Sequence, residues 1–494
     1  MKKRAYGLLA ITIIGSLLTM SSCKKYLDNN LSNGTYDNVF WNSQQDAEAA
    51  VNGAYALYRR ADQNRGAFFI WGDCPVGMIF PDNSYLKPVY ESGNFVVPYY
   101  EGMCHDWTNW FRIVNQCNMI IDKVAKIPEN KFKSSSGTAL SARNNLVGEA
   151  YFMRALAYFT MVRVWGDVPV QNEPIYAAEQ IKLKARSPQD SVLGLIMGDA
   201  QQASNLMTWD VSDKYLRARA GKGAAIALLA HVTAWQHKYD RTVTYVDSLL
   251  NSGYYTLESP ANLPDLYRAN KFSKENIFLI TNSNAYNEGS YNADDNHSLG
   301  YLTLMEPYLI GRTEVPLFTV LPEALSKYYT ESDKDARYNA FFGLTNTAKP
   351  LILKYSDVIY KNTAENTDPV IQSNVVIYRL ADLLLLKAEA LANLGQEQAA
   401  MQTANIVRAR AGISNMEGMT SDVLKRALLD ERIRELVGEG HNYFDMIRTG
   451  YYPNWMTASG GDRMAKKGWL WPVAKKVFDN NPLMVQNEYW KGRY

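Results

Sequence analysis

The stretch that most constrains the fold runs from Tyr378 to Ala411, because it predicts two helices folded back on each other. Apolar side chains recur at helical spacing in its first half, at Ala381, Leu384, Ala388 and Leu391. Gly395 interrupts this run, and a second stripe follows at Ala400, Ala404, Val407 and Ala411. Gly412 then stands where a helix C-cap is expected. Small residues on both stripes let the two helix axes approach closely.

The small and large residues of this hairpin match, in spacing, the positions of a tetratricopeptide (TPR) repeat. A single hairpin cannot bury its apolar face alone, so we expect further hairpins stacked on it. The alternative is an ordinary antiparallel helix pair in a mostly helical protein. Helical periodicity elsewhere favours the repeat, because it predicts pairs within 43–124, 140–206, 223–251 and 378–411.

The chain changes character between the third and fourth pairs. From 254 to 375 it is rich in Tyr, Asn, Pro and Gly, and short β-type runs appear, such as Asn276–Ile280. We expect an irregular insertion with small sheets over these residues. The predicted organisation is a helical region at 23–253, the insertion at 254–375, and a C-terminal region at 376–494 that contains the fourth pair.

The N-terminus predicts a lipoprotein signal peptide over residues 1–22. Three basic residues precede an apolar segment, residues 5–20, that is too short for a comfortable membrane span. Two serines and Cys23 follow, which looks like a bacterial lipobox. The implied chemistry is cleavage before Cys23 and acylation of its thiol, which gives durable membrane attachment. The alternative is an ordinary secretory signal with an incidental cysteine.

Charge and cysteine content exclude several classes of function. Removing residues 1–22 takes away three of the 52 basic residues and none of the 50 acidic ones, so the mature chain is close to neutral. This balance argues against nucleic acid as a partner. Cys74, Cys104 and Cys117 remain, with neither a disulfide framework nor the spacing of a zinc site. One bridge at most can form among them, and which pair would form it stays open.

An ordered set of short motifs runs through essentially the whole mature chain. The motifs are Cys23–Asp28, Ala155–Phe159, Trp165–Pro169, Gly221–Ala225, Tyr378–Asp382, Lys387–Ala390, Arg408–Gly412, Asp430–Leu436 and a Trp-Pro…Asn-Pro…Gln-Asn tail. Each is weak alone, but the ordered set resembles the SusD/RagB family of Bacteroidota outer-membrane nutrient-binding lipoproteins. Two positions depart from the family pattern. His441 stands where the family usually has arginine, and Glu488 interrupts a tail that is more often Asn-Pro-Gly-Tyr.

The resemblance implies a mostly α fold, with four TPR-like helix pairs packed against an irregular half that carries short β-strands. It implies a surface-exposed lipoprotein of the outer membrane, held by lipid on Cys23, that works with a SusC-like TonB-dependent barrel transporter. The expected ligand is a glycan or, less often, a peptide. No enzyme activity, cofactor or metal is implied.

Sugar binding needs aromatic faces for the apolar side of the ring and polar side chains for its hydroxyls. Residues 61–106 lack sustained periodicity, and a loop that long is usually functional. Its candidate ligand-binding residues are Trp71, Asp73, Asp82, Asn83, Tyr85, Tyr99 and Tyr100. The alternative is that these rings pin a long loop onto the helices.

A second candidate is the Tyr- and Asn-rich stretch 284–301, from which we select Tyr286 and Tyr291. Asp294, Asp295 and Asn296 in this stretch offer oxygen ligands for Ca²⁺, but they lack an EF-hand pattern, so a solvated loop is favoured.

Enzyme and metal interpretations have less support. His231 and His237 are six residues apart and face different sides of one helix, and the remaining histidines, including His441, are scattered. No nucleophile elbow or phosphate-binding loop occurs. The charged run Asp430–Glu435 predicts a helix face paired at i,i+4 rather than a catalytic cluster. A surface glycoside hydrolase and a TPR scaffold that binds only protein remain the alternatives to a glycan-binding protein.

Overall fold

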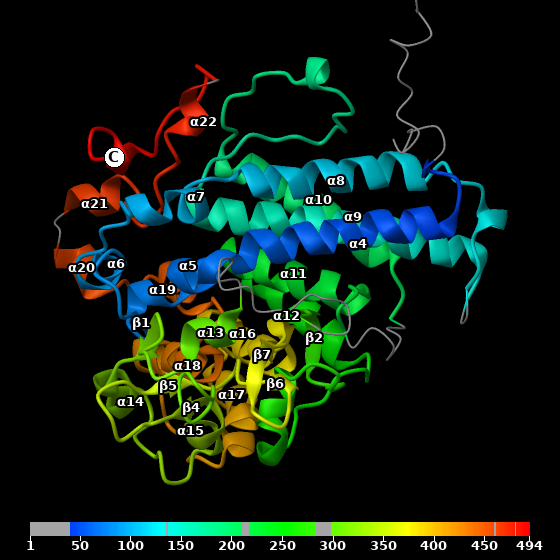
Figure 1. The fold of residues 1–494 in the computed structure, drawn as a ribbon. Coiled ribbons are helices and arrows are strands. Elements are labelled where there is room, and N and C mark those ends of the chain that lie inside the picture. The colour runs from blue at the N-terminus through cyan, green and yellow to red at the C-terminus, as the bar shows by residue number, and fades with distance from the viewer. Residues whose placement is uncertain (1–39, 135–136, 210–216, 283–297, 459–460, 480) are drawn as a thin grey trace, which may run out of the picture.

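The computed structural model describes residues 40–134, 137–209, 217–282, 298–458, 461–479 and 481–494 (Figure 1). Four antiparallel helix pairs form its scaffold, as the periodicity predicts. They are α4 (Gln44–Gln63) with α8 (Thr108–Val124), α9 (Ala139–Trp165) with α10 (Gln189–Leu206), α11 (Lys222–Trp235) with α12 (Tyr239–Leu250), and α16 (Leu380–Asn393) with α17 (Glu397–Ala411). Each pair contacts the next, through α8 and α9, α10 and α11, and α12 and α16. The mostly helical, TPR-like fold class is confirmed.

The fourth pair shows how the sequence specifies a hairpin. Gly395 has a positive φ of 75° and lies in the turn that joins α16 to α17. Gly412 caps α17 with a φ of 83°, a backbone conformation that glycine adopts without a Cβ clash. The alanines of both stripes are fully buried, among them Ala388 and Ala404. Helix α18 (Ser421–Leu436) packs across both α16 and α17 and covers the end of the stack.

The irregular half consists of short helices and four separate two-stranded antiparallel ladders. The ladders are β1 (Ile79–Pro81) with β3 (Phe318–Val320), β2 (Asn276–Ile280) with β8 (Val375–Arg379), β4 (Phe342–Gly343) with β5 (Leu351–Ile352), and β6 (Val358–Asn362) with β7 (Thr367–Ile371). The strand expected at 276–280 is therefore present. Because β8 leads directly into α16, the β2–β8 ladder attaches the insertion to the fourth helix pair.

Short helices fill the remaining segments of both halves. They are α5 (Ala67–Gly72), α6 (Lys87–Glu91), α7 (Glu101–Cys104), α13 (Leu299–Thr303), α14 (Pro322–Tyr328), α15 (Ala336–Phe341), α19 (Asn442–Thr449), α20 (Asn454–Ala458), α21 (Gly461–Ala465) and α22 (Lys476–Asp479). The C-terminal segment closes back on the helical half. The backbone N–H of Trp471 donates to the carbonyl of Val164, and its indole stacks on Phe95 with ring centroids 4.3 Å apart.

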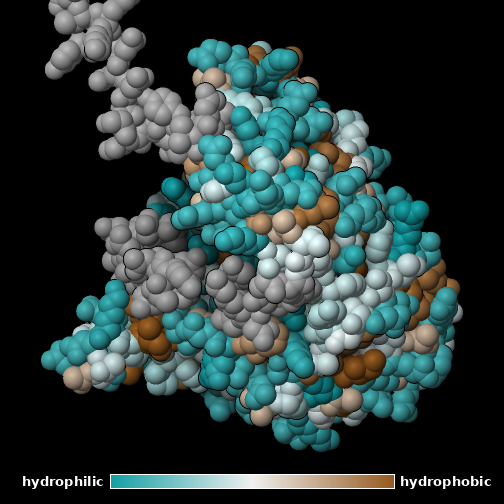
Figure 2. Space-filling model, turned by 90° about the vertical axis from the view of Figure 1, so that its right-hand side faces the viewer, coloured by the Kyte–Doolittle hydropathy of each residue, from teal (hydrophilic) through white to brown (hydrophobic). Residues whose placement is uncertain are grey.

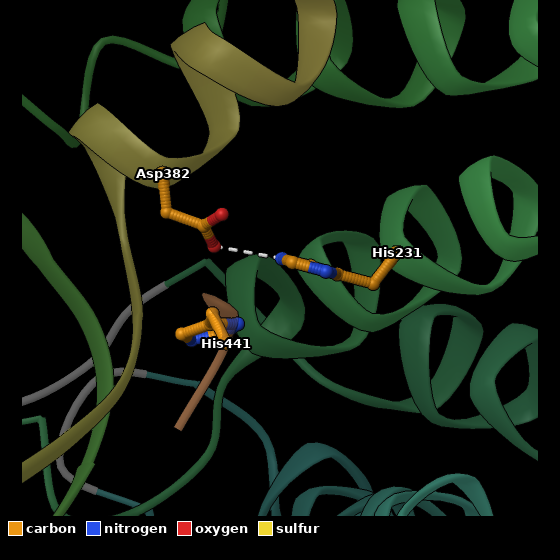
Figure 3. Close-up of side chains that lie close together, drawn as sticks. All are labelled: His231, Asp382 and His441. Carbon is orange, nitrogen blue, oxygen red and sulfur yellow. Dashed lines mark hydrogen bonds and ion pairs between the residues drawn. The ribbon is translucent and has the colours of Figure 1, made fainter. Parts of the chain in front are cut away.

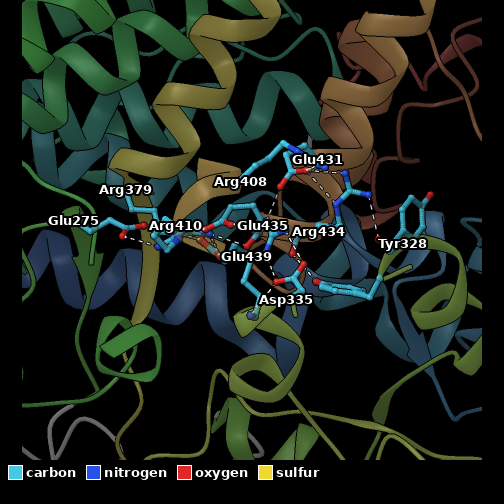
Figure 4. Close-up of polar contacts among 12 residues, drawn as sticks. Glu275, Tyr328, Asp335, Arg379, Arg408, Arg410, Glu431, Arg434, Glu435 and Glu439 are labelled. Atoms are coloured by element: carbon cyan, nitrogen blue, oxygen red, sulfur yellow. Dashed lines mark hydrogen bonds and ion pairs between the residues drawn. The ribbon is translucent and has the colours of Figure 1, made fainter. Parts of the chain in front are cut away.

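A buried ionic network joins the irregular half to α18 (Figure 4). Glu435 is fully buried and accepts from Arg337 at 2.8 Å, from Arg379 at 2.6 Å and from Arg410. Glu431, one turn earlier on α18, is equally buried. The expected pairing at i,i+4 is present for Asp430, which lies 3.2 Å from Arg426. It is wrong for these two glutamates, because their main partners come from α15, β8 and α17.

Figure 2 shows one face of the protein, and this face is mainly polar. On the face shown in Figure 2, hydrophilic residues dominate, and hydrophobic side chains appear only in small separate patches. Among the described residues, no helix combines the length and hydropathy that crossing a bilayer requires.

Candidate functional site

Two of the sequence candidates lie in the core and cannot meet a ligand. Trp71 on α5 is 1% exposed, donates its indole N–H to the carbonyl of Cys104 at 3.2 Å, and packs against Trp110 and Trp165. Asp73 is fully buried, and its carboxylate accepts the backbone N–H groups of Gly438 and Gly440. Burial raises the pKa of Asp73 to about 7. Trp71 thus packs its segment against the helices, in the way that the alternative for the aromatic rings describes, and Asp73 binds the backbone of residues 438–440.

The three cysteines of the described body are free, buried thiols. Burial raises the pKa of Cys117 to about 12 and that of Cys74 well above its usual value. The open question of a bridge is thus resolved in favour of three thiols that stay protonated at neutral pH.

Two other candidates form an exposed aromatic pair. Tyr85 and Tyr99 are 58% and 63% exposed, and their rings stack with centroids 5.5 Å apart and an interplanar angle of 20°. Tyr100 is buried beneath them and meets Tyr99 edge-on at 5.1 Å. Tyr99 and Tyr100 belong to a short 3₁₀ turn begun by Pro98, and successive side chains of such a turn point in different directions. One tyrosine therefore anchors the turn while its neighbour faces solvent.

Arg65, which the sequence analysis missed, completes this site. Its guanidinium lies 5.9 Å from the centroid of the Tyr99 ring, and it forms no ion pair with any residue that the structure describes. The backbone at Arg65 is left-handed, with φ 47°, and Gly66 follows with φ 76°. A Cβ at Gly66 would lie 2.8 Å from the Phe318 ring, so the break between α4 and α5 needs glycine there. A strained, non-glycine backbone of this kind is typical of functional sites.

These side chains surround an open pocket of about 300 Å³, which we call the tyrosine pocket. Its lining residues are Arg65, Asn83, Tyr85, Tyr99, Tyr100, Leu302 and Leu317. The β1–β3 ladder fixes its two sides, because the backbone N–H of Asp82 continues the ladder by donating to Leu317 at 2.7 Å. The pocket thus combines aromatic rings, a guanidinium and an amide, the combination that sugar recognition requires.

The remaining candidates divide between this site and its surroundings. Asn83 lines the pocket, and its side-chain oxygen accepts the backbone N–H of Tyr85, which fixes the turn that carries the ring. Asp82 forms an ion pair with Lys349 at 2.8 Å and is not among the lining residues. Tyr286, Tyr291 and the oxygen-rich run at 294–296 lie outside the described residues.

The fold also brings His441, one of the histidines scattered along the sequence, next to His231. His231 on α11, Asp382 on α16 and His441 before α19 are buried, and each offers a ligand atom within 4.8 Å of the others. The three residues are far apart in the sequence, so no local motif indicates this cluster.

Two family models match the chain and together span most of it. Residues 280–490 match the model described as "SusD family", and residues 25–234 match the one described as "Starch-binding associating with outer membrane". The chain belongs to the SusD/RagB family. "SusD-like protein P38" of Formosa agariphila is 25% identical, with 99% of each chain covered. Members of this family bind glycans, associate with the outer membrane and are not catalytic, so this SusD-like protein is a binding protein rather than a hydrolase.

Solved structures agree on the fold. The crystal structure of a SusD homolog from Bacteroides thetaiotaomicron superposes with a TM-score of 0.78 at 24% identity, covering 91% of this chain and 99% of that one. A protein described as "Laminarin binding SusD-like protein" gives a TM-score of 0.70 at 21% identity, covering 90% and 99%.

Proposed function

We propose that this SusD-like protein is a cell-surface lipoprotein that binds a glycan in the tyrosine pocket and passes it to a SusC-like TonB-dependent transporter. The observation that carries the proposal is the stacked, exposed pair Tyr85 and Tyr99 beside the guanidinium of Arg65, which has no ion-pair partner among the described residues. Large aromatic rings exposed together serve recognition more often than packing, and here a polar group lies beside them.

Each group of the pocket has a chemical role in this proposal. The tyrosine rings contact the C–H face of a sugar, and their hydroxyls reach its edge. Arg65 presents rigidly oriented N–H donors to ring or hydroxyl oxygens, and the Asn83 amide adds a neutral donor. Burial raises the pKa of Tyr100 to about 12, so its phenol remains protonated and supports Tyr99 at any physiological pH.

The lipid anchor completes the proposed topology. Cleavage before Cys23 would leave a polar, turn-rich segment, residues 24–39, between the acylated cysteine and the described body. Such a segment allows the body to stand in water above the membrane. The family description, which places its members at the outer membrane, supports this arrangement.

The binding test uses the chain from Lys24 onward against immobilised starch, laminarin and other polysaccharides, with short peptides as a second panel. The proposal predicts retention by at least one glycan, reduced for Tyr85→Ala and Arg65→Met. The matched control is Tyr176→Ala, which removes a 40% exposed tyrosine outside the pocket. If only the peptides retain the protein, the ligand is a peptide and not a glycan. If neither panel retains it, the proposal is refuted.

The anchor and the partner are tested in cells with the full chain. Labelled palmitate should appear on the wild-type protein and not on Cys23→Ser. The wild type should also co-purify from outer membranes with a TonB-dependent barrel protein. Absence of label would refute the anchor, and absence of any barrel partner after cross-linking would refute the handover.

A further inference from the structure

The buried cluster of His231, Asp382 and His441 joins three separate elements of the scaffold. Figure 3 shows the Asp382 carboxylate and the His231 ring pointing at each other, with the His441 ring beside them. The Nε2 of His231 lies 2.7 Å from Oδ2 of Asp382, and the two imidazole centroids are 5.6 Å apart. The three side chains are 3%, 1% and 7% exposed. Two imidazoles and one carboxylate so close together form the donor set of a transition-metal site.

The second histidine of the cluster is available as a ligand. Among the described residues, neither ring nitrogen of His441 has a hydrogen-bond partner, although the ring is almost entirely buried. A metal ion would give this imidazole the partner that the described residues do not provide.

Asp382 belongs to a buried network of charges. Ion pairs run from it through Arg432, Asp445 and Arg448 to Glu389. The buried guanidinium of Arg163, which lines the cavity beside His441, interacts with Asp445 and balances the third carboxylate of this network. The second oxygen of Asp382 accepts from Arg432 at 2.8 Å, which orients the carboxylate as an outer partner orients a metal ligand.

A small cavity beside His441 supplies space for a further ligand. Its volume is about 40 Å³, enough for at least one water molecule. Asp62 lines the same cavity, and its Oδ2 is buried without a hydrogen-bond partner in the described part of the chain. A metal-bound water in this cavity would have an acceptor in that carboxylate.

We propose that His231, Asp382 and His441 bind one divalent transition-metal ion of the zinc class. Binding replaces the hydrogen bond between His231 and Asp382: the imidazole proton moves from Nε2 to Nδ1, and Nε2 becomes a ligand. Zinc–ligand distances of about 2.1 Å in tetrahedral geometry separate two donors by about 3.4 Å, so this pair opens by about 0.7 Å from its present distance. The ion would link α11, α16 and the start of α19, which makes it a structural site in the scaffold, away from the tyrosine pocket.

The test measures metal content and stability of the chain from Lys24 onward. The protein is stripped with EDTA and then given Zn²⁺ in two ways, after folding and during refolding from guanidinium. We expect one zinc per chain after dialysis, and a melting temperature that rises with free Zn²⁺. Co²⁺ should give a visible absorption band that Zn²⁺ bleaches.

Three variants separate the site from adventitious zinc binding. His441→Gln and Asp382→Asn should weaken zinc binding about tenfold or more and abolish the thermal shift, while their melting temperatures in EDTA show that they fold. The control His237→Asn removes an exposed histidine of the same region at a left-handed position that asparagine tolerates, and it should bind zinc like the wild type. Wild-type protein without stoichiometric zinc under both loading conditions would overturn the proposal, as would undiminished binding by His441→Gln.

Discussion

Replacing Glu431 with glutamine tests whether the buried ionic network holds the two halves of the protein together. Glu431 is fully buried on α18 and accepts from Arg337 at 2.8 Å, from Arg434 at 2.7 Å and from Arg408. Glutamine keeps the shape of the side chain and removes its charge, so the variant imitates the protonated residue.

The magnitude follows from the pKa. Burial raises the pKa of Glu431, but the charges of Arg337, Arg434 and Arg408 outweigh it and hold the pKa at about 2, against an ordinary value of 4.5. The lower pKa corresponds to about 3 kcal/mol in favour of the ionised, folded form. Because the folded pKa is the lower one, this stability is present above pH 4.5 and is lost as the pH falls toward 2. At pH 3 about half of this free energy remains.

The assay is urea unfolding followed by tryptophan fluorescence at pH 7.5 and pH 3. Glu431→Gln should lower the free energy of unfolding by about 3 kcal/mol at pH 7.5 and by about half of that at pH 3. Glu417→Gln, at an exposed position, should change it by about 0.5 kcal/mol or less at both. A loss below about 1 kcal/mol at pH 7.5, or one that does not shrink on acidification, would refute the electrostatic account of this network.

Three further predictions concern the buried core. Gly72→Ala should destabilise the fold by about 3 kcal/mol in the same assay, because a Cβ there would lie 2.2 Å from the carbonyl oxygen of Gly440, and an unchanged midpoint would contradict this contact. Trp71→Ala should lower the free energy of unfolding by about 3–5 kcal/mol but leave the glycan affinity of the folded protein unchanged in calorimetry. A weaker affinity of the fully folded variant would show that Trp71 belongs to the binding site. The native chain from Lys24 onward should leave its three thiols unlabelled by a thiol reagent and expose all three on unfolding, so rapid labelling of the native chain would disprove their burial.

The helical scaffold was predictable because its signal is local. Apolar periodicity predicts a helix pair within 140–206, and the structure has α9 (Ala139–Trp165) and α10 (Gln189–Leu206) there. Gly395 and Gly412 each follow one helix of the fourth pair, where the positive φ angle of a glycine ends the helix. Helices of this kind are specified within ten to twenty residues of sequence.

The division of the aromatic segment into core and site was not predictable from the sequence. Trp71 and Tyr99 belong to one stretch without periodicity, and their residue types give equal reason to expect either burial or exposure. Trp71 is buried because α5 runs against Trp110 and Trp165, which lie on helices from other parts of the chain. Tyr99 is exposed because Tyr100 takes the inward position of the same turn. Only the tertiary packing distinguishes them.

The other features that the sequence did not predict depend on contacts between residues far apart in the chain. Glu431 matched a local i,i+4 pattern, but its partners Arg337 and Arg408 lie on other elements. The whole insertion, the fourth helix pair and α18 lie between His231 and His441 in the sequence. Arg65 follows an ordinary amphipathic helix, and only its position over Tyr99 connects it with the pocket.

Calorimetric titration of Tyr99→Ala with a glycan that the wild type retains tests the central claim most directly. The ring is 63% exposed and one of the two that form the stacked pair, so its removal leaves the fold intact and takes away half of the sugar-facing surface. We predict a loss of affinity of about tenfold, equivalent to about 1.4 kcal/mol, with Tyr176→Ala unchanged. An affinity of Tyr99→Ala equal to that of the wild type would contradict the assignment of the tyrosine pocket as the glycan site.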